Sequence, residues 1–114
     1  MTVIRHEVGP MMSRAVEHNG TVYLAGLTAA DASAGIEGQT QQILDHIDQL
    51  LALAGTSKSN LLTCMIYVTD IRDRPAMNKV YQAWFDPKNK PTRACVEVNL
   101  AGDTRIEIVV TAAK

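Results

Sequence analysis

The extended segments of this chain carry apolar side chains on both of their faces, which limits the folds open to them. Side chains of a strand alternate between its two sides. In the run from 61 to 68, one side carries Leu62, Cys64, Ile66 and Val68, and the other carries Met65 and Tyr67. A sheet of such strands needs cover on both faces. Only two segments have helical spacing, and two helices cover one face, so we expect a second copy of the chain to cover the other.

Apolar residues at helical spacing predict the two helices. The first begins near Ile36 and ends before Gly55, with its inward residues at Ile36, Thr40, Ile43, Leu44, Ile47, Leu50, Leu51 and Ala54. The second has Asp73 as its expected N-cap and Pro75 in its first turn, and it runs to about Phe85. Its inward residues are Met77, Val80, Tyr81 and the single tryptophan, Trp84.

The strands are bounded by turn signals. Asn19-Gly20 lies between Ser13–Glu17 and Thr21–Gly26 and predicts a hairpin, because both residues tolerate positive φ. Residues 2–7 could add an edge strand. The third strand is 61–68, and the last two, 92–98 and 104–112, are expected to pair as a hairpin across the glycine-containing segment 99–103. The order β-β-α-β-α-β-β describes a single α+β domain over residues 1–114.

Alternation also predicts the faces of the last two strands. The side expected to pack beneath the helices carries Ala94, Val96 and Val98 on one strand and Ile106, Ile108 and Val110 on the other. The opposite side carries Arg93, Cys95 and Glu97, followed by Arg105, Glu107, Val109 and Thr111. This second side is charged as well as apolar, which is typical of a buried site or an interface.

Composition excludes several classes of protein. The hydrophobic fraction is 46% and the charged fraction 20%, values typical of a folded globular chain. A formal net charge of -1 gives no basic surplus for a nucleic-acid backbone or an anionic membrane. No apolar run approaches the roughly 20 residues that span a bilayer, and the first ten residues do not read as a signal peptide. We expect a cytoplasmic protein.

Familiar catalytic and metal-binding motifs are absent from the sequence. It has no phosphate-binding glycine loop, zinc signature or nucleophile-elbow serine. Cys64 and Cys95 lie in apolar strands and are expected to be reduced packing residues. His6, His18 and His46 are far apart in sequence and are expected to be surface side chains.

The segment Pro91-Thr92-Arg93-Ala94-Cys95-Val96, followed by Ile106-Glu107-Ile108, resembles the signature of the RidA/YjgF reactive-intermediate deaminase superfamily. Supporting matches are Gly9-Pro10, Leu24-Ala25-Gly26, Gln39-Thr40 and Met77-Asn78. The resemblance implies a chorismate-mutase-like α+β fold, with a mixed sheet and two helices on one face. It also implies homotrimers with clefts between subunits. Many members of this superfamily hydrolyse enamines or imines to 2-keto acids and ammonia, with no metal or organic cofactor.

The resemblance also implies roles for individual residues. Arg93 would hold a substrate carboxylate through two parallel hydrogen bonds. The main-chain carbonyl of Cys95 would help to position the attacking water, and Glu107 would orient or deprotonate that water. Burial would raise the pKa of Glu107 and a nearby arginine would lower it, so the sequence leaves its charge open. Met12, Ala25 and Gly26 would line the pocket.

This chain departs from the family pattern at two pocket positions. Met11-Met12-Ser13 stands where the deaminases carry a tyrosine, and Ala25 stands where they carry a serine. The chain therefore resembles a divergent subgroup that lacks both pocket hydroxyls. A pocket lined by Met12 and Ala25 would be more apolar, which would change the preferred substrate or weaken catalysis.

Several functions fit these residues. The leading hypothesis is a deaminating hydrolase, and the alternative is a protein that binds a small carboxylate such as a 2-keto acid and regulates a partner. Arg93 and Glu107 could also form only an interfacial ion pair. Some relatives are described as endoribonucleases, but the net charge and the five aromatic residues (three Tyr, one Phe, one Trp) disfavour an RNA-stacking groove. Chorismate mutase shares the fold, but we find no basic cluster for a dicarboxylate.

Overall fold

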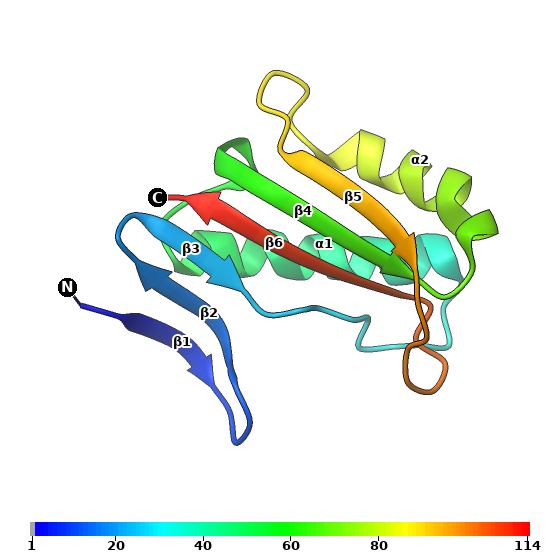
Figure 1. Cartoon of the computed structure of the whole chain (residues 1–114), viewed down its shortest axis with the longest axis horizontal. Helices are drawn as coiled ribbons and strands as arrows, with labels where there is room; N and C mark the ends of the chain where they lie inside the picture. The colour runs from blue at the N-terminus through cyan, green and yellow to red at the C-terminus, as the bar shows by residue number, and fades with distance from the viewer. Residues whose placement is uncertain (1) are drawn as a thin grey trace.

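The computed structural model describes residues 2–114. Its strands are β1 (Ile4–Val8), β2 (Ser13–His18), β3 (Thr21–Leu24), β4 (Leu61–Val68), β5 (Thr92–Glu97) and β6 (Ile106–Ala113), and its helices are α1 (Ile36–Leu53) and α2 (Arg74–Trp84). Short 3-10 turns, η1 (Lys58–Asn60) and η2 (Ile71–Asp73), precede β4 and α2. The six strands form one mixed sheet in the order β1-β2-β3-β6-β4-β5, with both helices on one face (Figure 1).

The expected elements are present, and the N-terminal edge strand forms as β1. In the β2–β3 turn, Asn19 and Gly20 both adopt positive φ, 53° and 76°, as the Asn-Gly signal predicts. All eight inward residues predicted for the first helix are buried, and Gly55 follows that helix with φ of 81°. In α2, Met77, Tyr81 and Trp84 are buried as predicted. Neither helix among residues 2–114 has the length and apolar character needed to cross a membrane.

The prediction that the last two strands pair as a hairpin is wrong. β5 pairs in parallel with β4, and β6 lies between β3 and β4, antiparallel to both. The connection crosses the end of β4, where Val98 N donates to Val68 O and Thr69 N donates to Arg105 O. It needs to span two strand spacings, about 10 Å, which a loop of this length does easily. The strongly apolar β4 thereby obtains a neighbour on each side.

The faces of β5 are also the reverse of the prediction. Arg93 is paired with the buried Cys64, and Cys95 with the buried Ile66, so both side chains lie on the helix side of the sheet. Ala94 and Val96 lie on the other side and are exposed. The β6 prediction is confirmed, because Ile106, Ile108 and Val110 are buried.

Two further predictions need correction where local structure interrupts the pattern. A register shift between Leu61 and Thr63 buries Leu61 and leaves Leu62 44% exposed, so Leu62 does not share the core side of β4. Asp73 stands at the N-cap of α2 without capping it by its side chain, and its carboxylate instead binds Arg105.

The face of the sheet opposite the helices, here called the open face, is not covered by any helix within residues 2–114. Figure 1 shows α1 behind the sheet and no helix in front of it. Tyr23 is 47% exposed and Val96 37% exposed on this face, beside the half-buried Met65, Tyr67 and Val109. Such an apolar surface is typical of an association site.

The buried carboxylate of Glu17, in β2, binds one side chain near each end of the chain. Glu17 is 6% exposed; its Oε1 accepts a 2.6 Å hydrogen bond from Lys114 Nζ, and its Oε2 lies against His6 Nε2 in β1. The prediction of a surface side chain is therefore wrong for His6, because strand pairing brings a distant acid beside it. The hydrogen bond from Lys114, and then that from His6, hold the pKa of Glu17 below its ordinary value.

We expect Glu17→Gln to lower the melting temperature at pH 7, because the neutral amide loses the ion pair with Lys114 and has only one oxygen to accept a hydrogen bond. A carboxyl whose pKa is depressed in the folded state stabilises it above the unfolded pKa, and this contribution is lost as pH falls through the folded value. As the pH falls below about 4.5, the free energy of unfolding should therefore decrease less for Glu17→Gln than for wild type. Chemical denaturation at several pH values measures this. Glu37→Gln, an exposed position in the first turn of α1, is the control; it loses only a favourable charge at the helix N-terminus, at most about 1 kcal/mol, and should show the smaller effect.

Candidate functional site

The first group of candidate residues gathers at the open face, where β3 ends against β6. Glu107 is paired with Tyr67 of β4, and its side chain turns toward Gly26. A Cβ atom built on Gly26 would lie 2.7 Å from Oε2 of Glu107. The carboxylate thus occupies the space that a side chain at position 26 would need, so a larger residue there would displace it.

Met12 and Ala25 lie at the same end of the β2–β3 hairpin. Ala25 N donates to Arg14 O at 2.9 Å, continuing the antiparallel pairing beyond β3. Met12 immediately precedes β2, and its carbonyl accepts a 2.8 Å hydrogen bond from Gly9 N in the β1–β2 turn. The Met12 side chain is 49% exposed. We call Met12, Ala25, Gly26 and Glu107 the hairpin group.

The second group lies at the opposite edge of the sheet, on the side of the helices. The Arg93 guanidinium carbon is 4.8 Å from the centre of the Tyr81 ring of α2, and Nη2 donates to Oδ1 of Asn78. Cys95 packs against the hydrophobic core from the same face of β5. The Arg93 side chain is therefore held by α2, not by the strand that carries Glu107.

One chain does not bring the two groups together. β4 lies between β5 and β6, and Arg93 and Glu107 project from opposite faces of the sheet. The sequence prediction that they share a face fails because parallel pairing fixes Arg93 beside Cys64. A pocket containing both residues would need a second subunit.

Arg93 has no carboxylate partner among residues 2–114. The salt bridges in this part of the chain join His6 and Lys114 to Glu17, Arg72 to Asp70, and Arg105 to Asp73. The groups nearest Arg93 are neutral: burial raises the pKa of Cys64 to about 11 and that of Tyr81 to about 12. A half-buried cation bonded only to an amide retains hydrogen-bond donors for an external acid.

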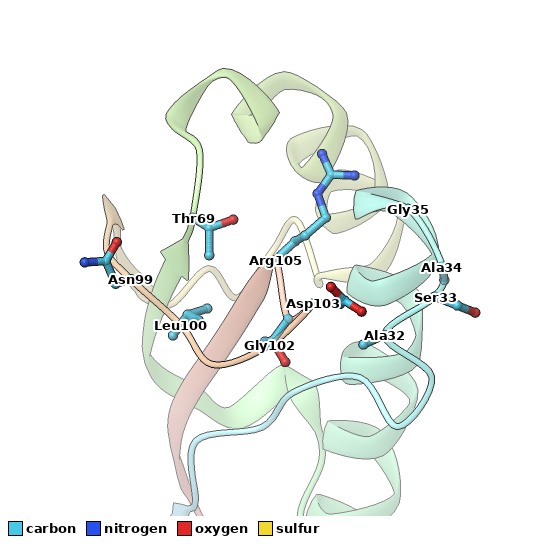
Figure 2. Close-up of a pocket in the computed structure, with 11 residues that line it drawn as sticks. Ala32, Ser33, Ala34, Gly35, Thr69, Asn99, Leu100, Gly102, Asp103 and Arg105 are labelled. Carbon is cyan, nitrogen blue, oxygen red and sulfur yellow. The ribbon is translucent and has the colours of Figure 1, made fainter.

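Three of the cavities formed by residues 2–114 lie elsewhere. Figure 2 shows one of about 630 Å³, between the loop before α1 and the β5–β6 connection, with Thr69 and Arg105 on its wall. Arg105 is engaged there by both carboxylate oxygens of Asp73, at 2.9 and 2.8 Å. Cavities of about 510 and 190 Å³ lie beside α1 and beside Glu17. None of the three is lined by Arg93, Cys95 or the hairpin group.

The sequence does not predict the contacts of Arg93 with Asn78 and Tyr81. It indicates Asn78 only as part of the family resemblance and Tyr81 only as a core residue. Their i, i+3 spacing on α2 places them on one face of that helix, which is the available signal. No cluster of three or more His, Cys, Asp or Glu side chains within residues 2–114 is arranged to hold a metal ion.

Gly26→Ala tests the close approach to Glu107. We expect the fold to survive with a stability change below about 1 kcal/mol, because the displaced atom ends a flexible side chain. The carboxylate should move, and any activity that depends on its position should fall about 10-fold or more. Thermal unfolding and keto-acid release measure the two effects. Gly35→Ala is the matched control, since a Cβ there meets nothing within 4 Å. Unchanged activity in Gly26→Ala would contradict a role for Glu107 geometry.

Comparison with known proteins identifies the family. The family model described as Endoribonuclease L-PSP matches residues 7–114. A RutC family protein of Haemophilus ducreyi is 38% identical over 112 residues, which is 97% of this chain and 96% of the relative. The RutC family protein YoaB of Escherichia coli is 33% identical over 114 residues, 99% of each chain.

Solved structures agree over the whole chain. A crystal structure of an uncharacterized protein from Pseudomonas aeruginosa has a TM-score of 0.96 and 35% identity, covering 99% of both chains. A member of the YjgF protein family from Neisseria meningitidis has a TM-score of 0.96 and 36% identity, covering 100% of this chain and 96% of that one. With the fold, the motif around Arg93 and the Gly26–Glu107 contact in place, the chain belongs to the RidA/YjgF/RutC family.

Proposed function

We propose that this protein hydrolyses reactive 2-enamine and 2-imino acids to 2-keto acids and ammonia, with the substrate carboxylate held by Arg93. The observation that carries the proposal is Arg93 itself. It is stacked on Tyr81, bonded to the Asn78 amide, and without a carboxylate partner among residues 2–114. A guanidinium in this state is prepared to bind a planar acid group through two parallel hydrogen bonds.

The site is composite and lies between subunits of a homotrimer. Arg93 and Cys95 come from one subunit, and the hairpin group comes from its neighbour. Two features support this arrangement: the two groups project from opposite faces of one sheet, and the apolar open face has no cover of its own. In a closed cyclic trimer, each subunit places one surface patch against a different patch of its neighbour. Arg93 and Cys95 of one subunit would then meet the hairpin group of the next at three equivalent interfaces.

The chemistry needs only these protein groups. Arg93 fixes the carboxylate, so that the adjacent C=N carbon faces the water held by Glu107 and the Cys95 carbonyl. Glu107 takes a proton from the water as the water oxygen bonds to carbon, and it returns that proton to the nitrogen. The carbinolamine then collapses: its hydroxyl proton passes by way of Glu107 to the amine nitrogen, the C–N bond breaks as the carbonyl forms, and ammonia leaves. One water is consumed for each keto acid and ammonia released.

The proposal is tested by generating imino acids beside the purified protein. An amino-acid oxidase supplies 2-imino acids from several amino acids, and keto-acid and ammonia formation are followed. We expect acceleration over buffer, strongest for apolar side chains because Met12 and Ala25 line the pocket. If no class of side chain shows acceleration, the deaminase proposal is wrong.

A second candidate function is binding of a small carboxylate without turnover. It is favoured by the absence of pocket hydroxyls at positions 12 and 25. Calorimetric titration with pyruvate or 2-ketobutyrate separates the two functions. Saturable binding that disappears in Arg93→Ala, together with no turnover, supports a regulatory protein. The endoribonuclease description of the family model is less well supported here, because the net charge is -1 and the chain has few aromatic residues.

A further inference from the structure

The guanidinium of Arg93 rests on a stack of aromatic rings presented by α2. Its central carbon lies 4.8 Å from the centre of the Tyr81 ring. That ring is stacked with Phe85, the residue after α2, at 5.0 Å between centroids and 19° between planes, and it is tilted against Trp84 of α2 at 6.1 Å and 49°. Tyr81 is only 4% exposed, so its position is fixed by the core.

This contact constrains how Arg93 can meet a ligand. A cation over a ring face is attracted by the negative centre of the ring, and the attraction grows when water is excluded. One flat face of the guanidinium is thus directed to Tyr81, and one Nη2 hydrogen is directed to Asn78. The remaining N–H groups lie in the plane of the fork, where a carboxylate binds.

We propose that Tyr81 is a positioning residue for the carboxylate site, its ring holding the Arg93 guanidinium in the orientation that receives the substrate acid. This inference rests on the proposed function, because it assigns the orienting of Arg93 to a residue that sequence analysis places only in the core. The arginine side chain has several rotatable bonds, and fixing them when a ligand binds costs conformational entropy. Because the Tyr81 ring orders the side chain beforehand, ligand binding avoids part of this cost.

The ring chemistry can be changed without changing the ring shape. We expect Tyr81→Phe to keep KM and kcat near wild type, since the ring and its negative face remain. Incorporating pentafluorophenylalanine at position 81 keeps the ring but weakens the negative face. This variant should raise KM by about 2- to 30-fold, the range that a cation–π contact corresponds to, with a smaller change in kcat. The Tyr81→Phe and pentafluorophenylalanine variants should have similar melting temperatures.

A spectroscopic measurement tests the platform independently of activity. The Nε–H proton of Arg93 should show a ring-current shift in wild type and in Tyr81→Phe, and should lose it in Tyr81→Leu. Trp84→Leu is the control, because it removes a neighbouring buried ring of α2 that does not lie over Arg93. It should lower the melting temperature while keeping the Arg93 shift and KM.

The outcomes separate this inference from the proposed function. An unchanged KM in the fluorinated variant, or an unchanged Arg93 shift in Tyr81→Leu, overturns the positioning role while leaving deaminase activity intact. Absence of both turnover and pyruvate binding in wild type overturns the proposed function, whatever the Arg93 shift shows. Loss of the shift together with a raised KM supports the inference.

Discussion

Arg93→Ala is expected to lower kcat/KM for imino-acid hydrolysis by about 10²- to 10⁴-fold. Each hydrogen bond to a charged group contributes about 1.5–3 kcal/mol, and the variant loses two of them. Every 1.4 kcal/mol corresponds to about a factor of ten in rate or affinity. Because the carboxylate is bound in both ground and transition states, part of the loss should appear as a raised KM for the imine and a raised Kd for pyruvate.

Two further variants identify the cause of that loss. Arg93→Lys keeps the positive charge but not the planar fork, and it should recover only a small part of the activity. Arg74→Ala removes an exposed arginine at the start of α2 and should leave kinetics unchanged. If Arg93→Ala remains folded and retains activity within about threefold of wild type, the carboxylate is held elsewhere.

Mixing two inactive variants should restore activity. Arg93→Ala subunits still supply Glu107, and Glu107→Gln subunits still supply Arg93. If each site takes one residue from each of two neighbours, random reassembly of an equal mixture should give about a quarter of wild-type activity, because each site draws both intact residues by chance. Glu107→Gln alone should lose about 10²- to 10⁴-fold in kcat, as expected for removal of a general base.

The mixing experiment has internal controls. Each variant reassembled alone should stay inactive, and a mixture in which subunits have not exchanged should also stay inactive. Size-exclusion chromatography with light scattering gives the oligomeric state, for which we expect three subunits. If the subunits exchange and the mixture stays inactive, Arg93 and Glu107 do not form a site across a subunit interface. A monomeric wild type would rule out a cleft between subunits.

Elements whose residues interact locally were predictable from the sequence. Helix α1 was predicted to within about one residue at either end because its inward residues recur with the helical period over five turns. The β2–β3 turn was predictable because Asn19 and Gly20 adopt the backbone angles that their side chains favour. Trp84 was correctly assigned to the core, where its ring nitrogen donates to both oxygens of Asp48.

Long-range polar contacts were not predictable. Gln39 lies near the start of α1, yet it is fully buried and binds backbone atoms of two separate loops, the one before α1 and the β5–β6 connection. His6 and Lys114 meet at Glu17 although they lie at opposite ends of the chain. Nothing in the local sequence around these residues specifies such partners, because the pairing of strands brings them together.

The sequence by itself determined the helices, the strands and the motif that includes Arg93 and Glu107. It also determined that the sheet would have two apolar faces, because alternating side chains were apolar on both sides of β4. Only the tertiary structure decided which face each charged residue occupies. Alternation divides a strand into two sides without saying which side meets the helices. On the edge strand β5 no residue is fully buried, so the choice depended on parallel pairing with β4 and on the Tyr81 and Asn78 side chains of α2.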